Sequence, residues 1–136
     1  YNFFMTHVSQ KKVEAIDFKQ AEKQLVKLIS KLETHGATHF INELFTEAER
    51  IMFTKRFAAI LMFQQNYSPY KVSNTVGISL STSQHYYKSY VEGQFDKLLA
   101  CIPKKQKSEF LSIVQDFMLF EISAKARARL LKRALG

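Results

Sequence analysis

The chain has 136 residues, a net charge of +8 and 46% hydrophobic residues, with only four Gly and two Pro. This length suits one domain, residues 1–136, and the scarcity of Gly and Pro indicates long helices with few turns, so we expect an all-α fold. No apolar run approaches the roughly 18 residues of a membrane span, and the single Cys101 excludes an internal disulfide, so we expect no membrane partner and a cytoplasmic location. No signal peptide is visible, although the chain starts at Tyr1 rather than Met, so a targeting segment could precede it.

Two helices are predicted before residue 46. The first spans about Lys12–Thr34 and is closed by His35-Gly36, and the second runs from about Thr38 to Phe45. The first helix has an apolar stripe at spacings of mostly three and four, formed by Val13, Ile16, Ala21, Leu25, Leu28, Ile29 and Leu32. Such a stripe must be buried, either within its own domain or on a second subunit.

A third helix is predicted from Glu47 to about Gln65. Its start is a capping box, in which the Thr46 hydroxyl takes the amide of Glu49 and the Glu side chain reaches back. The core candidates on this helix are Ile51, Met52, Phe57, Ile60, Leu61 and Phe63.

Residues 68–91 have the outline of a helix-turn-helix, which lays its second helix in the major groove of DNA. Ser68 is a good N-cap, and Gly77 supplies the residue that a left-handed turn needs. A second helix, capped by Ser79 or Ser81, then runs to the end of the segment. Two helices joined by Gly occur in many all-α proteins, so this spacing alone leaves DNA binding open.

The charge distribution favours a nucleic acid. No acidic residue occurs between Glu49 and Glu92, and the predicted motif lies within this window. A phosphate backbone rewards such an arrangement, because each neutralised phosphate releases counterions. The alternative is an ordinary set of solvated lysines. The basic residues of the window are Arg50, Lys55, Arg56, Lys71 and Lys88.

The C-terminal part is predicted to be one long helix, residues 104–136, with its regular pattern starting at about Ser108. The segment Ile102–Lys105 breaks the preceding pattern, and the helix has a broad apolar surface before a basic tail with no acid after Glu121. Three uses compete for the tail, namely contact with a DNA backbone, contact with RNA or a membrane surface, and solvation in a structural role, which we favour. We expect the apolar surface before the tail to be buried, with a partner subunit as one candidate for its cover. The basic residues of the tail are Lys125, Arg127, Arg129, Lys132 and Arg133.

The run FINELFTEAERIMFTKRFAAILMFQQNYSPYKVSNTVGISLSTSQHYYKSYVEG, residues 40–93, resembles the Trp repressor superfamily. Leu44–Glu49 is similar to the start of the scaffold helix of that family, and Arg56 falls where an arginine of that helix is expected. Gly77-Ile78-Ser79 is similar to its Gly-Val-Ser turn, and Ser81-Thr82 to the start of many recognition helices.

The resemblance implies a bacterial homodimer that binds palindromic double-stranded DNA. Residues 12–45 would then form intertwined N-terminal dimerisation helices, residues 46–93 would form the scaffold helix and the helix-turn-helix, and residues 104–136 would be an added C-terminal helix. A two-fold dimer would place two recognition helices about one DNA turn apart.

Three positions depart from the family. In the Trp repressor the indole lies between two arginines, with a glycine after the second. Here Arg56 matches the first arginine, but His85 and Tyr86 occupy the other two positions, so we expect no tryptophan pocket and no cofactor. Ser83 stands where an Ile or Val normally anchors the recognition helix, and Tyr86, Tyr87 and Tyr90 are the candidates to replace that anchor.

The candidate DNA-binding residues are polar and lie on the two helices of the motif. Gln can pair with adenine, Ser and Thr can contact bases or phosphate, and residues of the first motif helix are expected at phosphates. An ordinary exposed helix face is the competing interpretation. These candidates are Ser68, Tyr70, Lys71, Ser81, Thr82, Gln84, His85 and Lys88.

No catalytic or metal site is predicted. His35 and His39 are spaced i, i+4 but straddle Gly36, and no phosphate loop or nucleophile elbow is present. We therefore expect no enzyme but a nucleoid-associated, sequence-specific DNA-binding transcriptional regulator. The alternative from another class is a protein–protein assembly module, in which the helix-turn-helix binds no DNA and the C-terminal helix docks on a partner protein.

Overall fold

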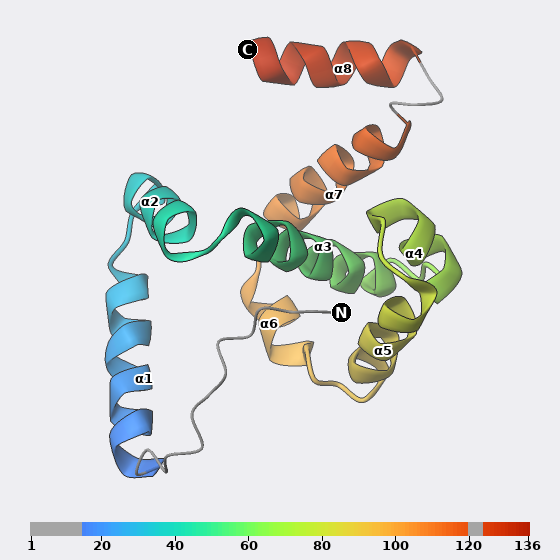
Figure 1. The fold of residues 1–136 in the computed structure, drawn as a ribbon. Helices are drawn as coiled ribbons and strands as arrows, with labels where there is room; N and C mark the ends of the chain where they lie inside the picture. The colour runs from blue at the N-terminus through green and yellow to red at the C-terminus, as the bar shows by residue number, and fades with distance from the viewer. Residues whose placement is uncertain (1–14, 120–123) are drawn as a thin grey trace. The chain divides into compact units, whose positions relative to one another are not determined.

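The computed structural model describes residues 15–119 and 124–136, and within these ranges it is all-helical with no strand (Figure 1). The chain divides into two compact units, residues 1–46 and 47–136. None of the described helices is long and apolar enough to cross a membrane. The helices are α1 (Ala15–Ser30), α2 (Thr34–Leu44), α3 (Glu47–Gln64), α4 (Pro69–Val76), α5 (Leu80–Val91), α6 (Asp96–Cys101), α7 (Lys104–Leu119) and α8 (Ala124–Leu135).

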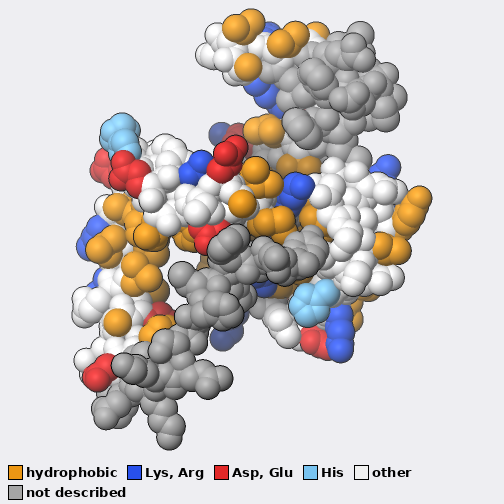
Figure 2. Space-filling model, viewed as in Figure 1, with side chains coloured by type: hydrophobic (Ala, Val, Ile, Leu, Met, Phe, Trp, Pro, Cys, Tyr) orange, Lys and Arg blue, Asp and Glu red, His pale blue; other side chains and the backbone are white. Residues whose placement is uncertain are grey.

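The described part of the first unit consists of α1 and α2, and it has no buried residue from residue 17 to residue 46. The apolar stripe of α1 is open, and hydrophobic side chains gather along this helix in Figure 2. Val13 and Ile16 of the predicted stripe lie outside the residues whose side chains are described. The exposed large hydrophobic residues of α1 are Phe18, Leu25, Val26, Leu28 and Ile29.

The boundary between α1 and α2 differs from the prediction. His35-Gly36 does not close the first helix but lies in the first turn of α2. The two helices are instead separated by the non-helical residues 31–33. Leu32 donates its amide to the carbonyl of Ile29 at 3.1 Å, which tightens the end of α1. The prediction that His35-Gly36 ends the first helix is therefore wrong. A glycine is tolerated inside a helix at a cost of about 1 kcal/mol relative to Ala, so its presence alone does not end one.

The second unit is built around α3, which packs against α4, α5 and α7. Residues 58–63 of α3 are all buried, so this half of the helix is surrounded on every side. Ile60, Leu61 and Phe63 are core residues as predicted. Ile51 is not, because its side chain is 47% exposed.

The C-terminal region forms two helices rather than the one predicted. Pro103 directly precedes α7, and its carbonyl accepts the amide of Lys107 at 3.2 Å, so Lys104 and Lys105 lie in the first turn of the helix. Residues 120–123, between α7 and α8, lie outside the described residues. The ammonium of Lys107 donates hydrogen bonds of 3.2 Å to the Gln64 side chain and to the Leu99 carbonyl, which connects α7 with α3 and α6.

Candidate nucleic-acid interface

The capping residues of α4 are the predicted ones, Ser68 and Gly77, and of the two serines predicted as alternatives for the start of α5, Ser79 is the cap. The Ser68 hydroxyl accepts the amide of Lys71 at 3.2 Å, and the Ser79 hydroxyl accepts the amide of Thr82 at 3.0 Å. Gly77 has φ 73° and ψ 48°, the left-handed conformation that favours glycine. Each helix start is thus satisfied locally by a side-chain oxygen, which explains why these boundaries are visible in the sequence.

Ser83 fixes α5 against α4. Its side chain is fully buried, and its hydroxyl donates a hydrogen bond of 2.7 Å to the carbonyl oxygen of Pro69. The anchor of α5 at this position is therefore polar rather than apolar. The hydrogen bond from Ser83 joins α5 to the N-terminal end of α4, where the N-cap Ser68 and Tyr70 flank Pro69.

The tyrosines of α5 take different positions. Tyr86 and Tyr90 are partly buried and pack against the core, as the prediction of an anchoring role requires. Tyr87 is 40% exposed, and its ring centroid lies 5.1 Å from that of Phe63. The tyrosines therefore add to the anchor at Ser83 but do not replace it.

The opposite side of α5 is polar and open. Ser81, Gln84, His85 and Lys88 are all exposed, and their spacing of three, four and seven residues places them on one face of the helix. Thr82 is half-buried, and its side-chain oxygen accepts a 2.8 Å hydrogen bond from Ser79. Thr82 therefore belongs to the capping structure more than to the open face.

The candidate residues of α4 are also exposed. Tyr70 is 67% exposed and Lys71 is exposed, whereas the next residue, Val72, is fully buried. Ser68 is exposed, but its hydroxyl is occupied by the cap. The side chains free to meet a phosphate at the start of α4 are thus those of residues 70 and 71.

Two cations of the acid-free window serve the fold. The ammonium of Lys55 donates a 2.9 Å hydrogen bond to the Gly77 carbonyl. The guanidinium of Arg56 lies 5.4 Å from the centre of the Tyr86 ring and 6.0 Å from that of Phe95. Sequence reasoning missed the role of Lys55, because its partner lies 22 residues away and no local pattern marks it.

Two arginines of the basic tail likewise form contacts within the second unit. Arg129 and Arg133 each place a guanidinium nitrogen 2.7 Å from a carboxylate oxygen of Asp116 on α7. Arg133 also donates a 2.9 Å hydrogen bond to the Ser112 hydroxyl. These two arginines therefore hold α8 on α7.

No group of three or more His, Cys, Asp or Glu side chains in the described part of the chain could hold a metal ion. The Nε2 atoms of His35 and His39 lie 3.3 Å apart on α2, and Nδ1 of His39 lies 3.8 Å from the Glu43 carboxylate, all three side chains being exposed. Cys101 is exposed and carries a free thiol.

Models of known protein families, curated proteins and solved structures give no match to this chain.

Proposed function

We propose that this protein is a sequence-specific, double-stranded DNA-binding transcriptional regulator that acts as a homodimer. In this proposal α4 and α5 are the two helices of a helix-turn-helix, and α5 is the recognition helix. Two recognition helices, one from each protomer, would occlude or shape a promoter.

The observation that carries the proposal is the open face of α5. Its four exposed polar residues lie within a stretch, residues 50–91, that contains no acidic side chain. Such a face offers hydrogen-bonding groups to base edges without repelling phosphates.

The exposed residues divide between two kinds of contact. Gln84 can pair in a bidentate manner with adenine, and Ser81 and His85 can donate to or accept from base edges. Lys71 and Lys88 are the exposed cations for phosphates, and Tyr70 can donate its hydroxyl to one. Phosphate contacts would fix the register of the protein, and contacts from α5 would select the sequence.

The exposed stripe of α1 supports a homodimer. Isolated helices of this length are marginal in water, and most helical stability in proteins comes from packing of an apolar face. In the described part of the first unit that face has no cover. A second copy would bury the stripe of each protomer against that of the other, as the resemblance to the Trp repressor superfamily implies.

A salt titration of binding to mixed-sequence duplex DNA tests the proposal. Affinity should fall steeply with salt, because the logarithm of the binding constant changes with a slope of about 0.9 per neutralised phosphate. Lys71→Glu and Lys88→Glu should each abolish measurable binding while leaving the circular dichroism spectrum unchanged. Lys104→Glu makes the same charge change on α7, outside both helices of the motif, and should bind like the unaltered chain.

The alternative is a protein–protein assembly module. It is favoured by the apolar side chains that α5 exposes beside its polar face, namely Leu80, Tyr87 and Val91. If the chain is dimeric by light scattering but has no DNA affinity at low salt, the assembly module becomes the proposed function in place of the DNA-binding regulator. Retained DNA binding by Lys71→Glu together with Lys88→Glu would refute the proposed face.

A further inference from the structure

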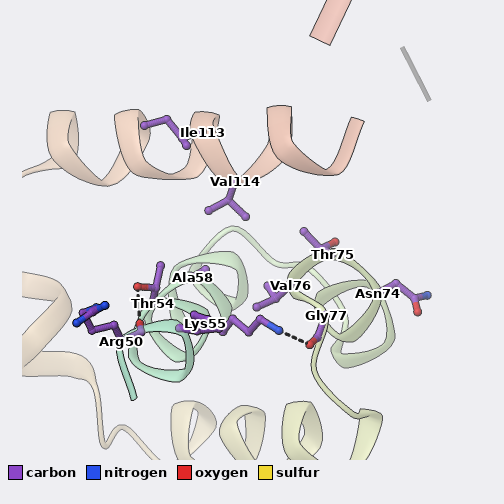
Figure 3. Close-up of a pocket in the computed structure, with 11 residues that line it drawn as sticks. Arg50, Thr54, Lys55, Ala58, Asn74, Thr75, Val76, Gly77, Ile113 and Val114 are labelled. Atoms are coloured by element: carbon purple, nitrogen blue, oxygen red, sulfur yellow. Dashed lines mark hydrogen bonds between the residues drawn. The ribbon is translucent and has the colours of Figure 1, made fainter. Parts of the chain in front are cut away.

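A groove of about 770 Å³ lies beside the turn between α4 and α5 (Figure 3). Its walls come from the first half of α3, from the end of α4 with Gly77, and from the middle of α7. This volume is within the range of about 300–1,000 Å³ typical of small-molecule sites. The groove lies wholly within the second unit and does not include Arg56, Tyr86 or Phe95.

The floor and walls of the groove are largely apolar. Ile113 and Val114 line it from α7, and Figure 3 shows Val114 pointing from α7 toward α3. Ile51 and Ile113 are 47% and 49% exposed, which is unusual for isoleucines that flank a packed helix pair. The groove therefore offers apolar surface that the described residues leave open to solvent.

The polar part of the groove is cationic. Arg50 and Lys55 line it, and none of the described residues that line it is acidic. The Lys55 ammonium carries three donors, and one of them is donated to the Gly77 carbonyl at 2.9 Å. The remaining N–H groups of a half-buried ammonium are suited to an anionic oxygen.

We propose that this groove binds a small apolar acid, a ring system or short hydrocarbon with one carboxylate, whose anionic oxygen is held by Lys55. The apolar body of the ligand would cover Ile51, Ile113 and Val114. Charge complementarity selects this occupant over a helix of a second copy, because α1 contains both acidic and basic side chains and matches no cationic groove.

The same lysine connects the ligand to the proposed recognition helix. Gly77 is the left-handed residue between α4 and α5, and Lys55 is bonded to its carbonyl. A ligand that accepts a hydrogen bond from Lys55 would compete with the Gly77 carbonyl for the ammonium. It would thereby change how firmly the turn is held on α3, and so change the placement of α5. This regulatory half of the inference rests on the proposed function, whereas ligand binding itself does not.

Two fluorescent probes that differ only in charge test the binding. They are 8-anilinonaphthalene-1-sulfonate, an anion, and N-phenyl-1-naphthylamine, the same ring system without the sulfonate. The anion should bind the full-length chain about tenfold more tightly, as expected for a charged hydrogen bond. When the anion is added to an ¹⁵N-labelled sample, the NMR signals of the amides of Thr54, Gly77 and Val114 should shift.

Two variants and a control assign the site. Lys55→Gln keeps a donor for the Gly77 carbonyl but removes the charge, so it should weaken the anion about tenfold and leave the neutral probe within about twofold. Ile113→Gln alters a half-exposed residue and should weaken both probes by about fivefold, because apolar contact is lost. Lys104→Gln lies outside the groove and should change neither affinity.

The proposal is overturned if the anion has no advantage over the neutral probe, or if the shifted amides belong to α1. It is also overturned if groove amides shift with protein concentration and the probe competes with self-association, because a second copy then fills the groove. The inference that the ligand changes the placement of α5 fails if the anion binds but the NMR amide signals of Ser81 and Gln84 do not shift. None of these readouts contains DNA, so a chain without DNA affinity refutes the proposed function and leaves the ligand site to be judged separately.

Discussion

The hydroxyl of Ser83 lies 2.7 Å from the carbonyl oxygen of Pro69, and this hydrogen bond joins the buried side of α5 to the first turn of α4. Ser83 is fully buried, whereas its neighbours Thr82 and Gln84 are half-buried and exposed. The bond therefore orients α5, and its loss should affect the stability of the pair more than the chemistry of the open face.

Ser83→Ala should lower the free energy of unfolding by about 1 kcal/mol, the usual net value of one intramolecular hydrogen bond. Ser83→Ile, which introduces the residue typical of the Trp repressor superfamily, should cost about 1–3 kcal/mol because a packed site must expand. Urea unfolding followed by circular dichroism measures both. Ser81→Ala, at an exposed position of the same helix, should stay within about 0.5 kcal/mol of the unaltered chain. An Ile variant as stable as the unaltered chain would show that the site is not packed as described.

Gly77→Ala should destabilise the chain, because φ is 73° at this position and an L-residue there costs about 1–2 kcal/mol. Gly77→Asn should cost less, since Asn visits this region more readily. Gly36 is the matched control, because it lies inside α2 in a helical conformation. Gly36→Ala should instead stabilise α2 by up to about 1 kcal/mol, reduced by the 3.2 Å approach of the new Cβ to Leu32 Cδ2. In thermal unfolding, both Gly77 variants should lower the melting temperature and Gly36→Ala should raise it. Shifts of the same sign at the two glycines would contradict the left-handed conformation at Gly77 and the helical one at Gly36.

These two glycines show how far the sequence alone reaches. Both limits of α4 are predicted correctly, and Ser79 is one of the two predicted starts of α5, because Ser68, Gly77 and Ser79 act on the backbone within three or four residues of themselves. Gly36 looked the same in the sequence, yet α2 runs through it. A glycine permits a left-handed turn but does not require one, so a local pattern cannot distinguish the two cases.

Contacts between distant parts of the chain could not be predicted. The exposure of the proposed DNA-contacting residues followed from helical spacing, but the use of Lys55 at Gly77 and of Arg129 at Asp116 did not. Those partners are set by how α3, α7 and α8 pack, and long cationic side chains fit many positions. The groove beside α3 was missed for the same reason, because Ile51 had the spacing of a core residue.

Arg56 and Tyr86 should be energetically coupled, because the guanidinium lies 5.4 Å from the ring centre. In a double-mutant cycle, Arg56→Gln and Tyr86→Leu should show a coupling of about 0.5–1 kcal/mol in the free energy of unfolding. The control cycle combines Arg56→Gln with Tyr70→Leu, at a tyrosine that is 67% exposed on α4. Its two effects should add within about 0.3–0.5 kcal/mol. A coupling in the first cycle no larger than that in the control would show that the ring and the cation do not interact in solution.

Asp116 should hold α8 on α7. Its carboxylate is 10% exposed and accepts Arg129 and Arg133 at 2.7 Å each, while the two arginine side chains are 45% and 41% exposed. Asp116→Asn keeps the shape but removes the charge, and should cost about 1–2 kcal/mol because both bonds are charge-assisted and only partly screened by solvent. Amide exchange in residues 128–135 should speed up accordingly.

The matched control for Asp116 is Glu109→Gln on the same helix. Glu109 lies 4.0 Å from Lys105, and the two side chains are 63% and 81% exposed, so this exposed pair should contribute less than about 0.5 kcal/mol. Raising the salt concentration should weaken the exposed pair first, because solvent screens it more effectively than a carboxylate enclosed by two arginines. If Asp116→Asn and Glu109→Gln give the same small change, and exchange in α8 stays unaltered, the arginines do not anchor that helix. They would then be free to serve as phosphate contacts at the end of the chain.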